Sequence, residues 1–331
     1  MRLSWDCPRS VWSSLLDHSP QATFFHSPEW ADIVAANGLG QPRTLFAQWA
    51  DGRQALCVLG VRPVWGGFVR AARSGTGGGH GGLVANGPLA EGERRAVYQA
   101  LWRRYGECGG STNPFGEPVP AGTGFTVTPA SPTLVVRLAS LADLRAQYHR
   151  GRLRAVERYL KQGVQLRHVP QPSLADWAGF SQLYDQEVVY WQSQGRPMHL
   201  VRDARWFQSL HQHAAKQLRL IVATVAGETA GMLVYASQRR LVSELYLVWD
   251  RRFGNHQVST ALKEACLAEC HAHGRQYVDF MPSGRLGGVE HFKASFGATP
   301  MPVSEFYHPS WRTRSLLALR PAPRPVAETA S

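Results

Sequence analysis

The chain has 331 residues, 44% of them hydrophobic, so it can bury an ordinary core, and wholesale disorder is excluded. Its length is comfortable for two domains of ~150 residues each. The formal net charge is +12, from 36 Lys and Arg against 24 Asp and Glu. Such a balance suits phosphate-bearing partners such as nucleic acid, nucleotides or anionic lipid head groups, although an arginine-rich surface without a dedicated partner has the same composition.

Cysteine usage and hydropathy exclude several other classes. Five cysteines at irregular spacings predict no disulfide framework. Cys266 and Cys270 have no second ligand pair at zinc spacing, so no metal site is expected. No apolar run approaches the ~20 residues that cross a bilayer, and the N-terminus lacks the features of a signal peptide. We therefore predict a cytoplasmic protein without a transmembrane segment, for which peripheral contact with the inner membrane face stays open.

The first half of the chain alternates helix and hairpin signals. Ser27 is a candidate N-cap with Pro28 at the first helical position, which predicts a helix ending near Gly38. Two apolar runs flank the turn pair Asp51-Gly52 and predict a hairpin. The elements that follow are a glycine-rich loop over 74–87, a helix over 91–109 and a strand over 133–140.

In the second half, the boundaries between helices and strands are marked more clearly. Basic helices over 141–163 lead into a strand, and the next predicted elements are helices over 173–195 and 204–215, three successive strands within 218–250, a helix over 258–274 and a strand over 276–282. The tail, 319–331, is rich in proline and alanine and is expected to be unstructured. We divide the chain into an N-terminal domain, 1–135, a C-terminal domain, 136–310, and a partly disordered tail, 311–331.

The stretch GGVEHFKASFGATP places Lys293 between Phe292 and Phe296, shortly after Asp279 in the strand signal YVDFMPSG. A cation held by aromatic packing, away from bulk water, stabilises a nearby negative charge more strongly than a solvated lysine would. A surface lysine above two buried rings has the same spacing. Asp279 could deprotonate an attacking ammonium or cap the following turn.

The order of these elements resembles the Gcn5-related N-acetyltransferase (GNAT) fold, and more specifically its two-domain Fem-type branch. That branch includes the tRNA-dependent aminoacyl transferases that build peptidoglycan cross-bridges. The segments that carry the resemblance are FFHSPEW, RGRLRAVERYLKQGVQLR, GETAGMLVYA and YVDFMPSGRLGGVEHFKASFGA. The resemblance implies an α/β (α+β) fold of two tandem GNAT-like domains with mixed, mostly antiparallel sheets flanked by helices. It also implies that Lys293 contacts phosphate or stabilises charge, with Phe292 at the substrate.

The donor turn implied by the resemblance is RRFGNHQVSTALKEA. In the parent fold, backbone N–H groups at this turn hold the phosphates of acyl-CoA. Arg251 and Gly254 match the expected pattern, with Arg252 beside them, whereas His256 replaces a glycine or alanine. Either the CoA site is altered or the donor is aminoacyl-tRNA. The absence of the long coiled-coil arm that many tRNA-dependent members carry makes tRNA a weaker candidate without removing it, since shorter members lack the arm.

Two further segments are candidate binding surfaces. Arg152 and Arg154 belong to a basic helical stripe, expected at the domain junction, that could bind a phosphodiester or a nucleotide-linked acceptor, or be solvated. The glycine-rich loop offers His80, Gly81 and Gly82 as pocket lining, with a mobile solvent loop as the alternative.

A third segment, YDQEVVYWQSQGR, carries four residues that could form an aromatic and acidic cleft wall: Glu187, Tyr190, Trp191 and Arg196. The alternative is helix packing by Tyr190 and Trp191.

These observations predict an N-acyltransferase that joins an activated acyl donor to an amino group of a cell-envelope or metabolite acceptor. The alternatives are an aminoacyl-tRNA-dependent transferase acting on a peptidoglycan precursor, and a non-catalytic module that binds an anionic ligand. No tightly bound cofactor is expected, only acyl-CoA or aminoacyl-tRNA as co-substrate. The expected partners are a small-molecule or lipid-linked acceptor and, for one alternative, tRNA, but not DNA.

Overall fold

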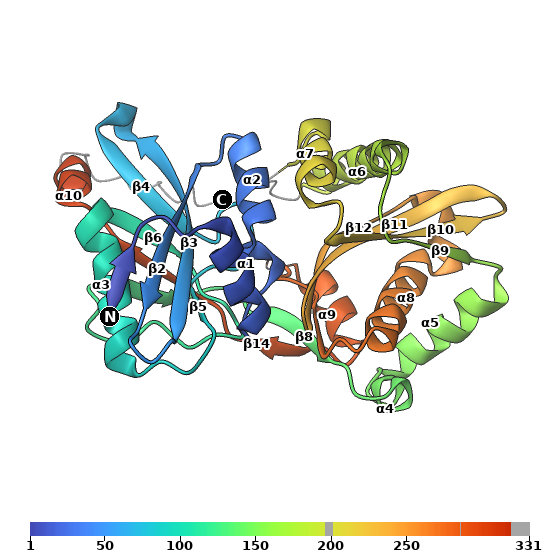
Figure 1. The fold of residues 1–331 in the computed structure, drawn as a ribbon. Helices are drawn as coiled ribbons and strands as arrows, with labels where there is room; N and C mark the ends of the chain where they lie inside the picture. The colour runs from blue at the N-terminus through green and yellow to red at the C-terminus, as the bar shows by residue number, and fades with distance from the viewer. Residues whose placement is uncertain (196–200, 285, 319–331) are drawn as a thin grey trace, which may run out of the picture.

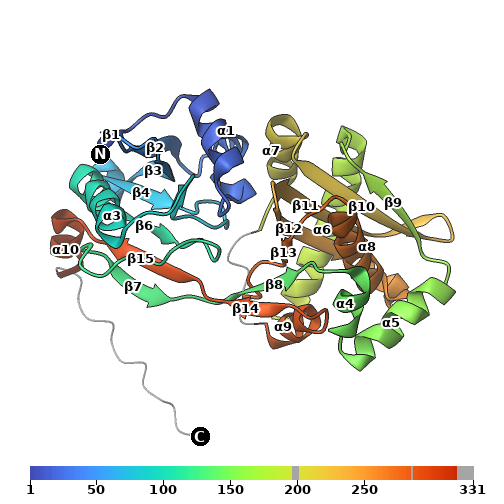
Figure 2. The same cartoon turned by 60° about the horizontal axis from the view of Figure 1, so that its bottom comes forward.

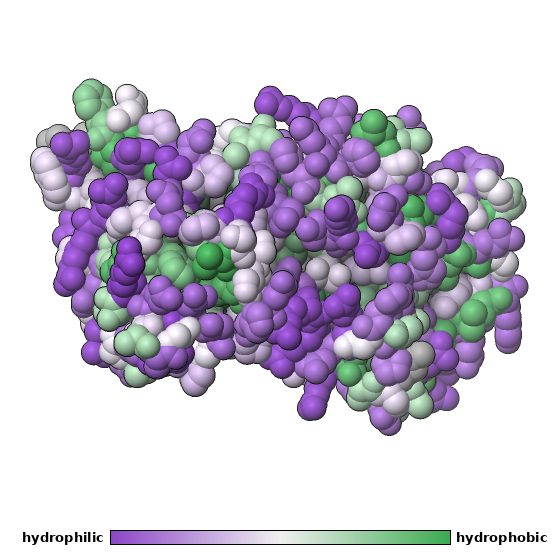
Figure 3. All heavy atoms as spheres, viewed as in Figure 1, coloured by the Kyte–Doolittle hydropathy of each residue, from purple (hydrophilic) through white to green (hydrophobic). Residues whose placement is uncertain are grey.

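The computed structural model describes residues 1–195, 201–284 and 286–318, which form two lobes side by side, each built on one β-sheet (Figure 1). No helix within these ranges is long and apolar enough to cross a membrane. Hydrophilic residues dominate the face shown in Figure 3, and apolar residues lie among them in separate small groups.

The first sheet has the strand order β1-β2-β3-β4-β6-β15-β7, with β5 paired to β3. Its strands are β1 (Arg2–Ser4), β2 (Gln41–Gln48), β3 (Gln54–Val64), β4 (Val69–Ser74), β5 (Leu83–Ala85), β6 (Glu107–Ser111), β7 (Thr126–Pro129) and β15 (Ser304–His308). The predicted hairpin is confirmed as β2 and β3, and Gly52 adopts the positive φ of +87° that its turn requires.

The second sheet has the order β14-β8-β13-β12-β11-β10-β9. Its strands are β8 (Thr133–Arg137), β9 (Gln165–Val169), β10 (Leu218–Val225), β11 (Glu228–Gln238), β12 (Leu241–Trp249), β13 (Tyr277–Asp279) and β14 (Thr299–Met301). The three successive strands predicted within 218–250 are β10, β11 and β12, and they pair antiparallel as a meander.

The two sheets share one plan. In each, three antiparallel strands are followed by a helix and then by a strand parallel to the third: β2-β3-β4 with β6, and β10-β11-β12 with β13. The connecting helices are α3 (Glu91–Tyr105) and α8 (Val258–Ala272). This repetition confirms the predicted fold class of two tandem domains with mixed, mostly antiparallel sheets.

The remaining helices cover the sheet faces. In the first lobe these are α1 (Arg9–His18) and α2 (Pro28–Ala36), with short 3-10 turns η1 (Phe24–His26) and η2 (Trp65–Gly67). The Ser27 side chain caps α2 as predicted, accepting a hydrogen bond from the Trp30 N–H. In the second lobe they are α4 (Leu141–Ala146), α5 (Arg150–Lys161), α6 (Leu174–Ser193), α7 (Ala204–Ala214), η3 (Arg251–His256) and α9 (Gly287–Ala294).

A shared hydrophobic core joins the lobes. One buried cluster combines Trp30 and Ile33 of α2 with Trp206 and Phe207 of α7, and the rings of Trp30 and Trp206 meet edge to face at 5.7 Å. Because apolar contact at this interface is continuous with the core of the second lobe, the relative position of the two sheets is fixed by packing.

The sheets divide the chain at other places than the predicted boundaries. Strand β8 starts before residue 135 yet belongs to the second sheet, and β15, assigned to the second domain by sequence, lies between β6 and β7 in the first (Figure 2). Glu107 anchors this returning segment by accepting from the Tyr307 hydroxyl, the Ser310 N–H and the Thr313 hydroxyl. Helix α10 (Trp311–Ala318) follows, and the predicted disordered stretch, 319–331, lies outside the described residues.

Candidate functional site

A cavity of about 950 Å³ lies at the junction of the lobes, where β12 and β13 separate. These two parallel strands pair only over Leu241–Ser243 and Tyr277–Asp279. Beyond that point, residues 244–249 form one wall and residues 280–284 form another. The first lobe contributes Phe25 and Trp30 with part of the glycine-rich loop.

Lys293 lies on the wall of this cavity with only 8% of its surface exposed. Helix α9 positions it, because Phe296 packs into the core against Phe280 while Phe292 lines the cavity beside the lysine. The Lys293 Nζ donates to the carbonyls of Met281 at 2.8 Å and Pro282 at 3.2 Å. Burial, and then the nearby positive charge of Lys263, lower the pKa of Lys293 to about 8. The surface-lysine alternative is therefore wrong.

A second buried lysine, which sequence reasoning missed, lies in the same cavity. The chain has four lysines, and two of them, Lys263 and Lys293, are buried here. The Lys263 Nζ lies 2.7 and 2.6 Å from the two carboxylate oxygens of Glu244, and 3.7 Å from the centre of the Phe280 ring. Burial lowers the pKa of Lys263, and the Glu244 carboxylate opposes that shift. The sequence feature that could have indicated this buried lysine is its position as the one lysine within the mostly apolar sequence of α8.

The charges on the cavity wall do not balance. Its cations are Arg202, Arg251, Lys263 and Lys293, and its carboxylates are Glu187 and Glu244. Both carboxylates are paired, Glu244 with Lys263 and Glu187 with Arg251 at 2.7 Å. Within the described ranges, neither Arg202 nor Lys293 forms an ion pair with a carboxylate. An anionic ligand would compensate both cations.

Arg202 is held without a carboxylate. Only 7% of the residue is exposed, its guanidinium lies 3.4 Å from the centre of the Trp206 ring, and its Nη2 donates to the Gly77 carbonyl. The guanidinium also forms a side-chain hydrogen bond with Tyr246. Arg202 lines the cavity, and a planar guanidinium suits phosphate or carboxylate oxygens. The neighbouring cleft-wall candidates Glu187 and Trp191 do line the cavity, whereas Arg196 lies outside the described residues.

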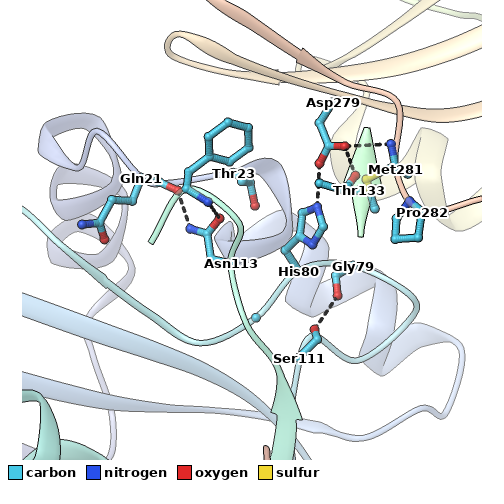
Figure 4. Close-up of polar contacts among 12 residues, drawn as sticks. Gln21, Thr23, Gly79, His80, Ser111, Asn113, Thr133, Asp279, Met281 and Pro282 are labelled. Carbon is cyan, nitrogen blue, oxygen red and sulfur yellow. Dashed lines mark hydrogen bonds and ion pairs between the residues drawn. The ribbon is translucent and has the colours of Figure 1, made fainter. Parts of the chain in front are cut away.

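Asp279 is buried beside the cavity but is not among its lining residues. Its carboxylate accepts from His80 Nε2 at 2.6 Å, from the Met281 N–H at 2.7 Å and from the Thr133 hydroxyl (Figure 4). The three donors come from three segments of the chain and occupy both carboxylate oxygens. This position suits a fixed structural acceptor better than a base that takes a proton from a ligand.

The donor turn has a conformation of its own. Asp250 caps the first residues of this turn. Its carboxylate accepts a hydrogen bond from the Arg252 N–H at 2.9 Å, and its carbonyl accepts one from the Phe253 N–H at 3.0 Å. The Arg252 side chain turns back to Asp250, and Gly254 lies against the Trp249 ring. Of the three predicted donor residues, Arg251 alone is among those that line the cavity.

The predicted position of the basic stripe is wrong. Helix α5 packs against α8 on the side of the second lobe remote from the first, so Arg152 and Arg154 do not lie at the domain junction (Figure 1). Arg154 is exposed. Arg152 instead supports α9 from behind, stacking 4.4 Å from the centre of the Phe292 ring and donating to the Ser295 hydroxyl at 2.9 Å. Helical spacing placed these arginines on one face without indicating which element that face meets.

The glycine-rich loop is packed between the lobes. His80, Gly81 and Gly82 are buried, which excludes the solvent-loop alternative. They are not among the residues that line the main cavity, where Gly77 and Gly78 take that place. No group of three or more His, Cys, Asp or Glu side chains in the described ranges could hold a metal ion.

Comparison with protein-family models matches residues 147–294 to the acetyltransferase (GNAT) domain. A search of curated protein sequences found no match. Among solved structures, FemX has a TM-score of 0.74 at 11% identity, covering 96% of this chain and 99% of that chain. L-PGS from Bacillus licheniformis has a TM-score of 0.52 at 13% identity, covering 87% and 89%. A tandem GNAT protein from the clavulanic acid biosynthesis pathway has a TM-score of 0.50 at 14% identity, covering 92% and 98%.

The fold and the cavity define an α/β protein of two tandem GNAT-like domains. Residues 147–294 in the second lobe match the GNAT domain model, and the two-domain fold is similar to that of FemX, as the resemblance implied.

Proposed function

We propose that the protein is an N-acyltransferase that forms an amide bond between an activated acyl donor and an amino group in the cavity between the lobes. The observation that carries this proposal is the buried ammonium of Lys293 on the cavity wall. The neutral acceptor amine attacks the acyl carbonyl directly. As the tetrahedral intermediate collapses, the bond to the leaving sulfur or oxygen breaks, and the leaving group takes up the proton that the attacking nitrogen releases. Lys293 stabilises the oxygen of that intermediate in a site screened from bulk water.

The charge of the cavity supports a substrate that carries phosphate. Arg202 and Lys293 together leave two positive charges without carboxylate partners among the described residues. A diphosphate or two separate phosphate groups would balance them, as in a nucleotide-linked or lipid-linked acceptor. The proposal therefore favours a cell-envelope precursor reached in the cytoplasm or at the inner membrane face. The name of one neighbour, a candidate lysylphosphatidylglycerol synthetase from Agrobacterium fabrum, is in keeping with a lipid-linked class.

A second candidate is an aminoacyl-tRNA-dependent transferase acting on a peptidoglycan precursor. The occupied donor turn favours it, because the Asp250 carboxylate and carbonyl already accept two of the backbone N–H groups that would otherwise hold a pyrophosphate. An aminoacyl ester of tRNA needs no pyrophosphate at the turn.

The test offers purified protein radiolabelled acetyl-CoA or a mixed pool of labelled aminoacyl-tRNA, with a nucleotide-linked peptidoglycan precursor and a bacterial lipid extract as acceptors. Transfer of label to an acceptor, identified by its mass, supports the proposal, and sensitivity to ribonuclease selects the tRNA donor. The variant Lys293→Met should lose turnover, while the exposed-lysine control Lys216→Met keeps it. Tight binding of an acceptor without transfer from either donor would instead support a non-catalytic binding module.

A further inference from the structure

Arg202 and Lys293, the two cavity cations without a carboxylate partner among the described residues, are connected to residues 75–82 of the glycine-rich loop in the first lobe. Arg202 donates directly to the carbonyl of Gly77 in this loop. Further along the loop, His80 extends across the lobe boundary to Asp279 (Figure 4). The loop is fixed within its own lobe by Ser111, which donates to the Gly79 carbonyl at 3.1 Å.

A continuous path leads from His80 to the amine of Lys293. His80 Nε2 donates to one carboxylate oxygen of Asp279, and the other oxygen accepts from the Met281 N–H. The carbonyl of the same Met281 then accepts from Lys293 Nζ. Each step is a hydrogen bond of 2.6–2.8 Å, so the position of the loop is transmitted to the ammonium through one carboxylate and one peptide unit.

The backbone conformation of Met281 directs its carbonyl oxygen toward Lys293. Met281 has a φ of +61°, a strained conformation that non-glycine residues rarely adopt. The hydrogen bond from its N–H to the side chain two residues earlier, Asp279, holds it there. If this residue relaxed, its carbonyl would turn away from Lys293.

We propose that His80 and Asp279 are positioning residues for Lys293, so that the cavity has its working geometry only when the loop of the first lobe is seated against the second. The role rests on the proposed function of Lys293. It differs from the general-base role considered from sequence, since Asp279 acts here through Met281 and does not touch the substrate. The charged groups around Lys293 are Lys263 on α8, Glu244 on β12 and Asp279 on β13.

The test follows the four lysine side chains by NMR after labelling with ¹³C at Cε, which needs no activity. In the wild type, the Lys293 signal should titrate near pH 8, because burial lowers the pKa of this lysine to about 8. Asp279→Asn removes an attractive charge and should move that midpoint to lower pH, with the alkaline limb of kcat moving in parallel. His80→Ala should change the Lys293 signal and lower kcat about ten- to hundredfold, because the ammonium is displaced. His80→Gln, which offers an N–H at a similar reach, should restore both.

The matched control is Glu107→Gln. Glu107 is another buried carboxylate that accepts from three donors, but it lies in the first lobe and anchors β15. This variant should lose stability without moving the Lys293 signal or its midpoint. A Lys293 signal and titration unchanged in both Asp279→Asn and His80→Ala overturns the positioning role, whatever the activity. A wild-type protein that transfers no acyl group overturns the proposed function instead, and the NMR comparison still decides the positioning role.

Discussion

Replacing Lys293 by methionine should inactivate the protein and at the same time change the pH dependence of its stability. The fall in the lysine pKa from 10.5 to about 8 corresponds to about 3 kcal/mol of destabilisation at pH 7. Methionine removes that penalty but also removes two hydrogen bonds to the Met281 and Pro282 carbonyls, each contributing about 1 kcal/mol. We expect Lys293→Met to be more stable than the wild type by about 1 kcal/mol at pH 7.

The sign of this difference should reverse on the alkaline side. Because the pKa of Lys293 is lowered in the folded state, the unfolded chain binds more protons between about pH 8 and 10.5. Wild-type stability therefore rises through that window relative to the variant, and the advantage of Lys293→Met shrinks by about 2 kcal/mol between pH 7 and pH 9.5. Urea unfolding at the two pH values measures it. A stability difference that is the same at both would refute the claim that Lys293 is a strained, buried ammonium.

Three further outcomes are expected. The alkaline limb of the pH–rate profile should fall with a midpoint near pH 8, because Lys293 acts in its charged form; a rate that keeps rising through pH 9 would contradict this. Lys263→Met should destabilise the protein by about 3–5 kcal/mol in denaturant unfolding by leaving Glu244 buried and unpaired, and adding Glu244→Leu should recover most of the loss; no recovery would mean that the pair is not the cause. Gly79→Ala should lower stability by about 1–3 kcal/mol, since its Cβ would lie 2.2 Å from the Phe25 ring; unchanged thermal unfolding would show that the loop is not packed there.

The features that sequence predicted well are the local ones. The Asp51-Gly52 turn and the Ser27 cap depend on neighbouring residues alone, and both are confirmed. Lys293 could be singled out because two aromatic residues at helical spacing frame it within a motif of the Fem-type branch.

The features that sequence missed depend on contacts between distant segments. Strand β15 pairs with β6 across about 190 residues, as in Glu305 with Ser111, and no local pattern indicates which sheet a five-residue strand joins. The burial of Lys263 could not be predicted, because a lysine on a helix is normally placed on the solvent face. Most of the surface of α8 is buried, including the face that carries Lys263. The role of Asp279 could not be predicted, since its partner His80 is 199 residues away.

The most direct test of the account is single-turnover acyl transfer at saturating donor and acceptor, comparing the wild type with Lys293→Met under conditions where both are folded. If Lys293 stabilises the oxyanion, the wild type should form an amide product and the variant should react at a rate lower by about 10²–10³. Equal rates from the two proteins would contradict it.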